Sequence, residues 1–305
     1  MIDFSFVIVN FRTPKLTVEA VKSIISHEKK IKYEIIVVDN NSGDNSISYL
    51  SKYLPKSVRL ILSDENLGFG RANNLGLAKA KGRFFVIFNS DAYEVEEILP
   101  KIKKIFDSRK NISILGTKIL YPNYELQQSH GSLPGLLSIF TWMFFLDDIP
   151  ILNFFLPSLH KKSKFFYKKT VKTGWVTGAL MVFKRSVYRK LNGFNPEIFL
   201  YSEDIDICLR AKKHKYRTYF FNEVKVIHIG QQSSKGVSSS ALIGEITGLI
   251  YISKKYFNPV KYLMIKLLLT LGSLLRLTIF GIILKSSSAK YIYSQILKII
   301  WGENK

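Results

Sequence analysis

The fold of this chain is decided near its N-terminus, where residues 4–39 read FSFVIVNFRTPKLTVEAVKSIISHEKKIKYEIIVVD. Two runs rich in β-branched and aromatic residues, Phe4 to Asn10 and Tyr33 to Asp39, predict strands. Between them, Thr13 is the expected N-cap of a helix, with Pro14 at its first position and apolar residues following at helical spacing. A strand, a helix and a second strand in this order predict an α/β unit.

The same alternation continues along the chain. Val58 to Leu62 and Phe84 to Asn89 are further predicted strands, separated by a helical segment. The pattern predicts an α/β protein with a doubly wound sheet. Because ligands bind beyond the carboxyl ends of the strands in such sheets, Asn10, Asp39 and the stretch Asn89-Ser90-Asp91 are expected to lie where a ligand binds.

The composition is strongly basic, with 45 Lys and Arg against 23 Asp and Glu in 305 residues and a formal charge of +22. This charge predicts an anionic partner, either nucleic acid, acidic lipid or a phosphorylated substrate. No nucleic-acid-binding signature is visible in the sequence. The single cysteine, Cys208, excludes an intramolecular disulfide and is interpreted as a small helix residue. The N-terminus lacks the basic region of a signal peptide, so we expect a cytoplasmic protein.

Two apolar stretches lie outside the predicted sheet. Residues 133–160 are rich in aromatic residues but broken by prolines and an Asp pair, so they are either a lipid-facing or acceptor-facing insertion or a buried subdomain core. Residues 262–284 are long enough to cross a bilayer but contain Lys266 and Arg276. The flanking lysines favour a basic interfacial or re-entrant helix on anionic lipid over a true span or a soluble helical pair.

Two polar loops are candidates for nucleotide binding. VVDNNSGD (37–44) ends a strand, and its carboxylate and amides could read a nucleobase, although Asp39 could equally cap the following turn. NLGFGRANN (66–74) has glycines that let the backbone approach a ligand. Arg71 in this loop could approach an anion or stack on a base, and the alternative is a solvated arginine at a loop-to-helix turn.

Asn89-Ser90-Asp91 follows a predicted strand, where a carboxylate can hold a divalent ion that bridges a diphosphate. One carboxylate supplies too few ligands for a divalent cation, so a further ligand is expected from elsewhere in the chain. His228, at the end of another predicted strand, is the candidate, although a lone histidine is more often structural.

A cluster of acids begins a helix that is predicted to run from Ser202, as its N-cap, to about His214. Acids in the first turn complement the helix dipole by about 0.3 to 1 kcal/mol each without any catalytic role. Since the chain has few acids, however, Glu203, Asp204 and Asp206 also suggest a site that uses carboxylates, one of them as a base toward an attacking hydroxyl.

Taken in order, seven segments resemble family 2 glycosyltransferases, and most closely their rhamnosyltransferase-like branch. They are VIVNF (7–11), VVDNNSGD (37–44), NLGFGRANNLGL (66–77), FNSDA (88–92), GWVTGALMVFKR (174–185), GFNPEIFLYSEDIDICLRA (193–211) and HIGQQSS (228–234). The resemblance covers roughly residues 3–235. It implies a GT-A fold, a divalent cation (Mg²⁺ or Mn²⁺) and transfer of a sugar with inversion at its anomeric carbon.

The resemblance also implies roles for individual residues. Asp204 corresponds to the general base, while Glu203 and Asp206 would orient acceptor hydroxyls or serve the structure. Asp91 corresponds to the remaining acid of the DxD signature and His228 to the later metal ligand, whereas Asn89 replaces the first acid and predicts weaker metal binding. Asp39 corresponds to the acid that reads the base, and the other expected nucleotide-sugar contacts are Asn10, Asn41, Gly68, Arg71, Asn73, Asn89, Trp175 and Gly178.

The implied partners are a dTDP- or UDP-sugar donor, a glycan or polyprenyl-diphosphate-linked acceptor, and the anionic cytoplasmic face of a membrane. Rhamnose is the expected sugar. The alternatives are galactofuranose, glucose or N-acetylglucosamine, or a catalytically silent membrane scaffold on the same fold. Residues 1–238 are the expected GT-A domain, with 133–165 as an apolar insertion, and 239–305 a helical membrane-associating region.

Overall fold

The computed structural model describes residues 1–230 and 239–302, which belong to two compact units. The first unit consists of Met1–His130 and Lys164–Gly230. The second consists of Gly131–Ser163 and the described residues within Gln231–Lys305. The last four residues of the motif HIGQQSS lie outside the described part of the chain.

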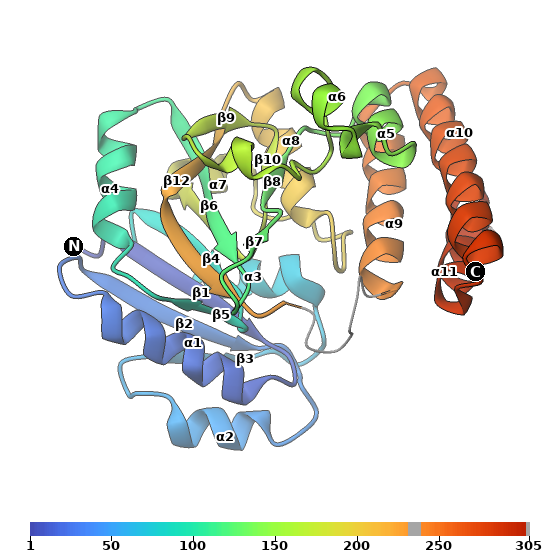
Figure 1. Cartoon of the computed structure of the whole chain (residues 1–305). Coiled ribbons are helices and arrows are strands. Elements are labelled where there is room, and N and C mark those ends of the chain that lie inside the picture. Colours follow the sequence, from blue (N-terminus) through green and yellow to red (C-terminus); the bar gives the residue numbers. More distant parts are fainter. Residues whose placement is uncertain (231–238, 303–305) are drawn as a thin grey trace. The chain divides into compact units, whose positions relative to one another are not determined.

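The first unit is built on a mixed ten-stranded sheet (Figure 1). Its strands are β1 (Phe4–Asn10), β2 (Tyr33–Asp39), β3 (Arg59–Leu62), β4 (Phe84–Phe88), β5 (Ala92–Glu94), β6 (Ile112–Leu120), β7 (Leu126–Gln127), β9 (Val171–Thr173), β11 (Leu180–Lys184) and β12 (Arg217–His228). The main order is β3-β2-β1-β4-β11-β6-β12-β5, with β7 on β6 and β9 on β12. Because β1, β2 and β4 are parallel, their carboxyl ends meet at one edge of the sheet. Two further short strands of the chain are β8 (His130–Gly131) and β10 (Trp175–Val176).

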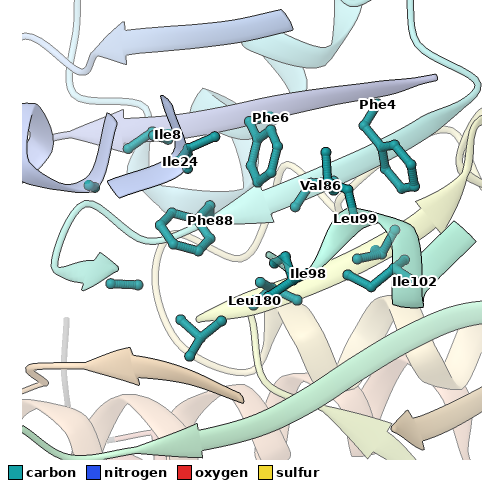
Figure 2. Close-up of a cluster of buried hydrophobic side chains, with 14 of the residues drawn as sticks. Phe4, Phe6, Ile8, Ile24, Val86, Phe88, Ile98, Leu99, Ile102 and Leu180 are labelled. Carbon is teal, nitrogen blue, oxygen red and sulfur yellow. The ribbon is translucent and has the colours of Figure 1, made fainter. Parts of the chain in front are cut away.

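Helices cover both faces of this sheet. They are α1 (Pro14–His27), α2 (Ser46–Tyr53), α3 (Gly68–Ala78), α4 (Leu99–Ser108), α7 (Arg185–Lys190) and α8 (Glu203–Lys213), with a 3₁₀ turn at Lys164–Tyr167. On one face, Ile24 of α1 and Ile102 of α4 join the buried cluster shown in Figure 2. On the other face, α3 approaches so closely that a Cβ at Gly76 would lie 2.6 Å from Cγ1 of Val7.

These elements confirm the predicted doubly wound α/β fold. The strands predicted at Phe4 to Asn10 and Tyr33 to Asp39 have those bounds in the structure. Their continuous apolar character follows from burial, because helices cover the sheet on both sides. The sheet is mixed rather than wholly parallel, since β11 runs antiparallel to both β4 and β6. Cys208 is a buried helix residue, as interpreted.

Thr13 and Ser202 occupy the predicted N-cap positions, but neither side chain makes a capping hydrogen bond. Helix α1 begins at Pro14, but the Thr13 side chain makes no capping hydrogen bond, because its hydroxyl lies 3.1 Å from that of Ser90 and also contacts Asn10. Helix α8 begins at Glu203, but Ser202 has a left-handed φ of 70° and makes no side-chain cap. The turn before α8 therefore has the geometry of a tight reversal rather than of a serine cap.

The second unit is helical. Its elements are α5 (Leu136–Met143), a 3₁₀ turn (Leu146–Asp148), α6 (Pro150–Phe155), α9 (Ser239–Tyr256), α10 (Pro259–Arg276), a π-helical continuation (Leu277–Ile283) and α11 (Ser287–Trp301). Residues 133–160 are partly buried, as expected of a subdomain core. Trp142 and Met143 are buried in a cluster with α9, α10 and α11, whereas Ile151 and Phe155 are 72% and 82% exposed.

One continuous helical stretch in this unit, Pro259–Ile283, is long and apolar enough to cross a membrane, judged by length and composition alone. The charge of Arg276 within it is accommodated by α5. The Arg276 guanidinium donates to the backbone oxygens of Trp142 and Met143 and lies 4.4 Å from the ring centroid of Phe145. Such carbonyls at a helix C-terminus attract a cation, so Arg276 ties α10 to α5.

Candidate functional site

The carboxyl edge of β1 and β2 carries a buried polar network. Asn10 and Asp39, which end these strands, are both 0% exposed. Nδ2 of Asn10 donates to Oδ2 of Asp39 at 2.7 Å, and the backbone N–H and hydroxyl of Ser42 donate to the same carboxylate at 3.1 and 2.7 Å. This network fixes the turn after β2, which is the capping alternative weighed for Asp39.

A hydroxyl pair extends this network toward β4. The Thr13 hydroxyl lies 3.4 Å from Oδ1 of Asn10 and 3.1 Å from the hydroxyl of Ser90, which follows β4. The residues that follow the ends of β1, β2 and β4 are therefore linked by hydrogen bonds. The polar residues expected at this edge from the sequence are brought together.

Asp91, the residue after Ser90, and His228 form the candidate metal centre. Nε2 of His228, the last residue of β12, lies 3.1 Å from Oδ1 of Asp91 and 3.1 Å from Nδ2 of Asn89. Oδ1 of Asn89 is buried and accepts no hydrogen bond from any residue that the structure describes. A carboxylate and an imidazole nitrogen are both ligands that divalent cations accept, so Asp91 and His228 fit the implied Mg²⁺ or Mn²⁺.

The ionised form of Asp91 is favoured at this place. Burial raises the pKa of the Asp91 carboxyl, but the hydrogen bond and the charge of His228 and the N–H of Gly230 outweigh it and hold that pKa below its ordinary value. Within residues 1–230 and 239–302, no group of three or more His, Cys, Asp and Glu side chains could hold a metal. A cation at Asp91 and His228 would therefore need further ligands beyond these side chains.

A second wall of the site is formed by the start of α3. Nδ2 of Asn40 donates to Oδ1 of Asn66 at 2.9 Å, and Oδ1 of Asn40 accepts from the N–H of Leu67, so this loop is joined to the turn after β2. Gly68 has a φ of 72°, and a Cβ there would lie 2.1 Å from the backbone oxygen of Phe199. Only glycine fits this contact between two backbones.

Three other predicted contact residues have different surroundings. A Cβ at Gly178 would lie 3.2 Å from the ring of Phe69, so the turn that contains Gly178 also packs against α3. Trp175 is buried in β10, and Asn41 is exposed with its amide bonded to the backbone oxygen of Asp64.

Two of the polar residues on α3 are already engaged. Arg71 forms an exposed ion pair with Glu65 at 2.7 Å, which corresponds to the solvated-arginine alternative for this residue. Asn73 is 0% exposed and donates to the backbone oxygen of Phe69 at 2.9 Å. Asn73 therefore lies inside the helix packing rather than at the surface of the site.

The acids of α8 lie in three different environments. Glu203 is 7% exposed, and burial together with the charge of Asp204 raises its pKa to about 8. Asp204 is half-buried, and its Oδ1 accepts from the N–H of Ile205 at 2.8 Å. Asp206 is 0% exposed and pairs with Nε of Arg210 at 2.7 Å, an arginine that also holds the backbone oxygens of Leu191 and Gly193. Asp206 thus serves the packing of α8.

Four residues of this site were not assigned from the sequence. Ser42 and Thr13 hold the strand-end network, and Nε of Arg12 donates to the backbone oxygen of Ser42 at 2.9 Å. Gln127 of β7 contacts His228 through both ends of its amide. The position of Ser42 three residues after Asp39 is a turn signal that could have identified it. Gln127 has no comparable signal, because it lies in a two-residue strand.

The fold defines an α/β protein of the GT-A type. A mannosyltransferase from Pyrobaculum calidifontis, solved with GDP-Man and Mn²⁺, has a similar fold, with a TM-score of 0.59 over 99% of this chain and 86% of that one at 15% identity. Residues 1–349 of Staphylococcus aureus TarS give a TM-score of 0.56 over 98% and 80% of the two chains at 17% identity.

This chain belongs to glycosyl transferase family 2, whose model matches residues 5–191. A second model, glycosyl transferase family group 2, matches residues 151–291. A glycosyltransferase of Methanocaldococcus jannaschii is 25% identical over 70% of this chain and 66% of its own length. Rhamnosyltransferase WbbL of Escherichia coli K12 is 26% identical over 68% of this chain and 77% of its own length.

Proposed function

We propose that this chain is an inverting glycosyltransferase that moves a sugar, with rhamnose as the first candidate, from a dTDP- or UDP-sugar to a growing, lipid-linked cell-surface polysaccharide. The observation that carries the proposal is the position of Nε2 of His228 within 3.1 Å of both the Asp91 carboxylate and the side-chain amide of Asn89 in a family 2 chain. Similarity to the rhamnosyltransferases WbbL of Escherichia coli and WbaN of Salmonella anatum supports rhamnose.

The donor would lie along the carboxyl edge of the sheet. Asp39 and Asn10 shape the loop after β2, against which the base would rest, and Gly68 lets the backbone of α3 come close to the nucleotide. Asp91 and His228, with Asn89, would hold the divalent cation. A cation held there supplies positive charge against the negative charge that develops on the departing nucleoside diphosphate.

Asp204 would act as the general base. Its carboxylate takes the proton of an acceptor hydroxyl, the hydroxyl oxygen forms a bond to the anomeric carbon, and the bond from that carbon to the diphosphate oxygen breaks with its electron pair. Attack from the face opposite the leaving group inverts the anomeric carbon. Glu203 is suited to donate a hydrogen bond to the acceptor, because a carboxyl with a pKa of about 8 is mainly protonated at neutral pH.

The experiment that tests this function is a panel of UDP-, dTDP- and GDP-sugars given to the purified chain with an acceptor lipid, with and without Mn²⁺. We expect nucleoside diphosphate to be released, and the acceptor to be extended, with one donor in the presence of metal. If a folded chain stays silent across the panel, the scaffold alternative replaces this proposal. Extension with a donor other than dTDP-rhamnose would keep the activity and correct the sugar.

We also propose that the second unit attaches to the anionic cytoplasmic surface of a membrane. Along α10, exposed apolar side chains recur at helical spacing, at Val260, Leu263, Leu267, Leu271 and Leu274. Residues 239–302 contain one acid, Glu245, against eight Lys and Arg. An apolar stripe on a basic unit matches the surface of anionic lipid, where apolar burial and charge attraction add.

Replacing Leu267 and Leu271 together by glutamate is expected to lower binding to vesicles of phosphatidylglycerol and phosphatidylcholine at least tenfold, since each buried leucine contributes about 1.5–3 kcal/mol. Flotation of the vesicles measures the binding. Ile47→Glu, at an exposed position on α2, is the control and should bind like the original chain. Equal binding by the double variant contradicts attachment through α10, and retention in membranes after alkaline extraction indicates a true span instead.

A further inference from the structure

Gln127 contacts His228 with both ends of its side-chain amide. Nε2 of Gln127 donates to the backbone oxygen of His228 at 2.5 Å, and Oε1 of Gln127 lies 2.9 Å from Nδ1 of the His228 ring. The two residues are 101 positions apart in the chain. Gln127 belongs to β7, which pairs with β6 and places Gln127 opposite Ile119. The sheet therefore fixes the backbone position of Gln127.

The orientation of this amide follows from its partners. A backbone carbonyl oxygen can only accept, so the NH₂ end of Gln127 must face the carbonyl of His228. The amide oxygen must then face Nδ1, and because this oxygen can only accept, Nδ1 has to carry a hydrogen. In the neutral ring, Nε2 is consequently the nitrogen that carries the lone pair.

That lone pair points to the candidate metal centre. Nε2 of His228 lies 3.1 Å from Oδ1 of Asp91. Nε2 of His228 also lies 3.1 Å from Nδ2 of Asn89, so the nitrogen faces both residues of the candidate metal centre. The backbone around the ring is held as well, since the N–H of Ile229 donates to the backbone oxygen of Asp91 at 2.9 Å and His228 pairs with Ala92 of β5. The backbone of His228 is therefore held in place, and the side chain can change mainly by rotation of the imidazole ring.

We propose that Gln127 is a positioning residue that fixes the tautomer and ring orientation of His228, so that Nε2 is presented to a divalent cation together with Asp91. The inference rests on the proposed function, because it assigns a task to that same metal centre. Hydrogen-bonded partners of metal-binding histidines commonly change metal affinity by about 10- to 100-fold when they are lost. Gln127 itself would touch neither the cation nor the donor.

The test compares Gln127→Leu, which removes both hydrogen bonds, with Gln127→Glu, which keeps an acceptor for Nδ1–H. Gln128→Leu is the matched control, because Gln128 is the adjacent glutamine and is exposed. Mn²⁺ affinity in the presence of UDP is measured by the electron paramagnetic resonance signal of the free ion. We expect the dissociation constant to rise about 10- to 100-fold for Gln127→Leu, and to stay within a few-fold for Gln127→Glu and Gln128→Leu.

The kinetic readout separates positioning from general damage. The Mn²⁺ concentration for half-maximal transfer should rise in Gln127→Leu, while kcat at saturating Mn²⁺ stays near that of the original chain. Unchanged Mn²⁺ affinity in a folded Gln127→Leu variant overturns the inference and leaves the proposed function standing. If Gln127→Leu does not fold, weak Mn²⁺ binding by a folded Gln127→Glu variant overturns it. If the original chain with UDP binds no Mn²⁺, the metal-dependent function fails along with the inference.

Discussion

Asp204→Asn is expected to lower kcat by about 10²- to 10⁴-fold, the usual contribution of a positioned general base. The amide has almost the same shape as the carboxylate, and its oxygen can still accept from the N–H of Ile205, so the fold should be retained. What is lost is the group that takes the proton of the acceptor hydroxyl. Transfer measured at saturating donor and acceptor, with circular dichroism as the check on folding, gives the comparison.

Glu203→Gln is the matched control for this experiment. Because burial and the charge of Asp204 raise the pKa of Glu203 to about 8, the residue is mainly a neutral carboxyl at pH 7, and an amide resembles it there. We expect this variant to keep transfer at pH 7 within about tenfold of the original chain, well short of the loss given by removal of a general base. If instead Glu203→Gln abolishes transfer and Asp204→Asn is mild, the two acids have the opposite roles.

Asp91→Asn is expected to have the second large effect, a fall of about 10²- to 10³-fold in kcat/KM, typical for removal of one group that stabilises developing charge. The centre would then retain His228 as its one strongly basic protein ligand. Mn²⁺ binding in the presence of nucleotide should weaken in parallel. Steady-state transfer and Mn²⁺ titration of the same preparation provide the two measurements.

The opposite change, Asn89→Asp, is the companion to this experiment. It adds a carboxylate where the structure has a buried amide oxygen without a partner among the described residues, so tighter Mn²⁺ binding is expected. Loss of metal affinity in Asp91→Asn with no gain in Asn89→Asp would leave Asp91 as a ligand and exclude Asn89 from the centre. Full activity of Asp91→Asn without added metal would contradict the proposed metal centre.

The sequence predicts well the features that depend on local pattern. The bounds of β1 and β2, the start of α1 and the position of His228 at the end of a strand follow from residue type and spacing within short windows. The carboxyl edge of a doubly wound sheet then brings Asn10 and Asp39 together, because parallel neighbours end on the same side. The roles of these residues in binding and catalysis stay predictions.

Contacts between distant segments could not be predicted in this way. The sequence carries no sign that Gln127 would reach His228, or that the hydroxyl of Thr13 would contact Ser90 rather than cap α1. Among the acids of α8, similar spacing from the helix start conceals different surroundings, since Asp206 meets Arg210 one turn later whereas Glu203 is buried beside Asp204. Burial and partner, rather than residue type, separate these carboxyl groups.

The contact between Gly68 and Phe199 is formed mainly by main-chain atoms. The N–H of Phe69 donates to the backbone oxygen of Phe199 at 3.0 Å, so main-chain atoms join the start of α3 to the segment that leads into α8. Main-chain contacts survive most exchanges of side chain. Substitutions at neighbouring positions are therefore expected to leave the acids of α8 in place.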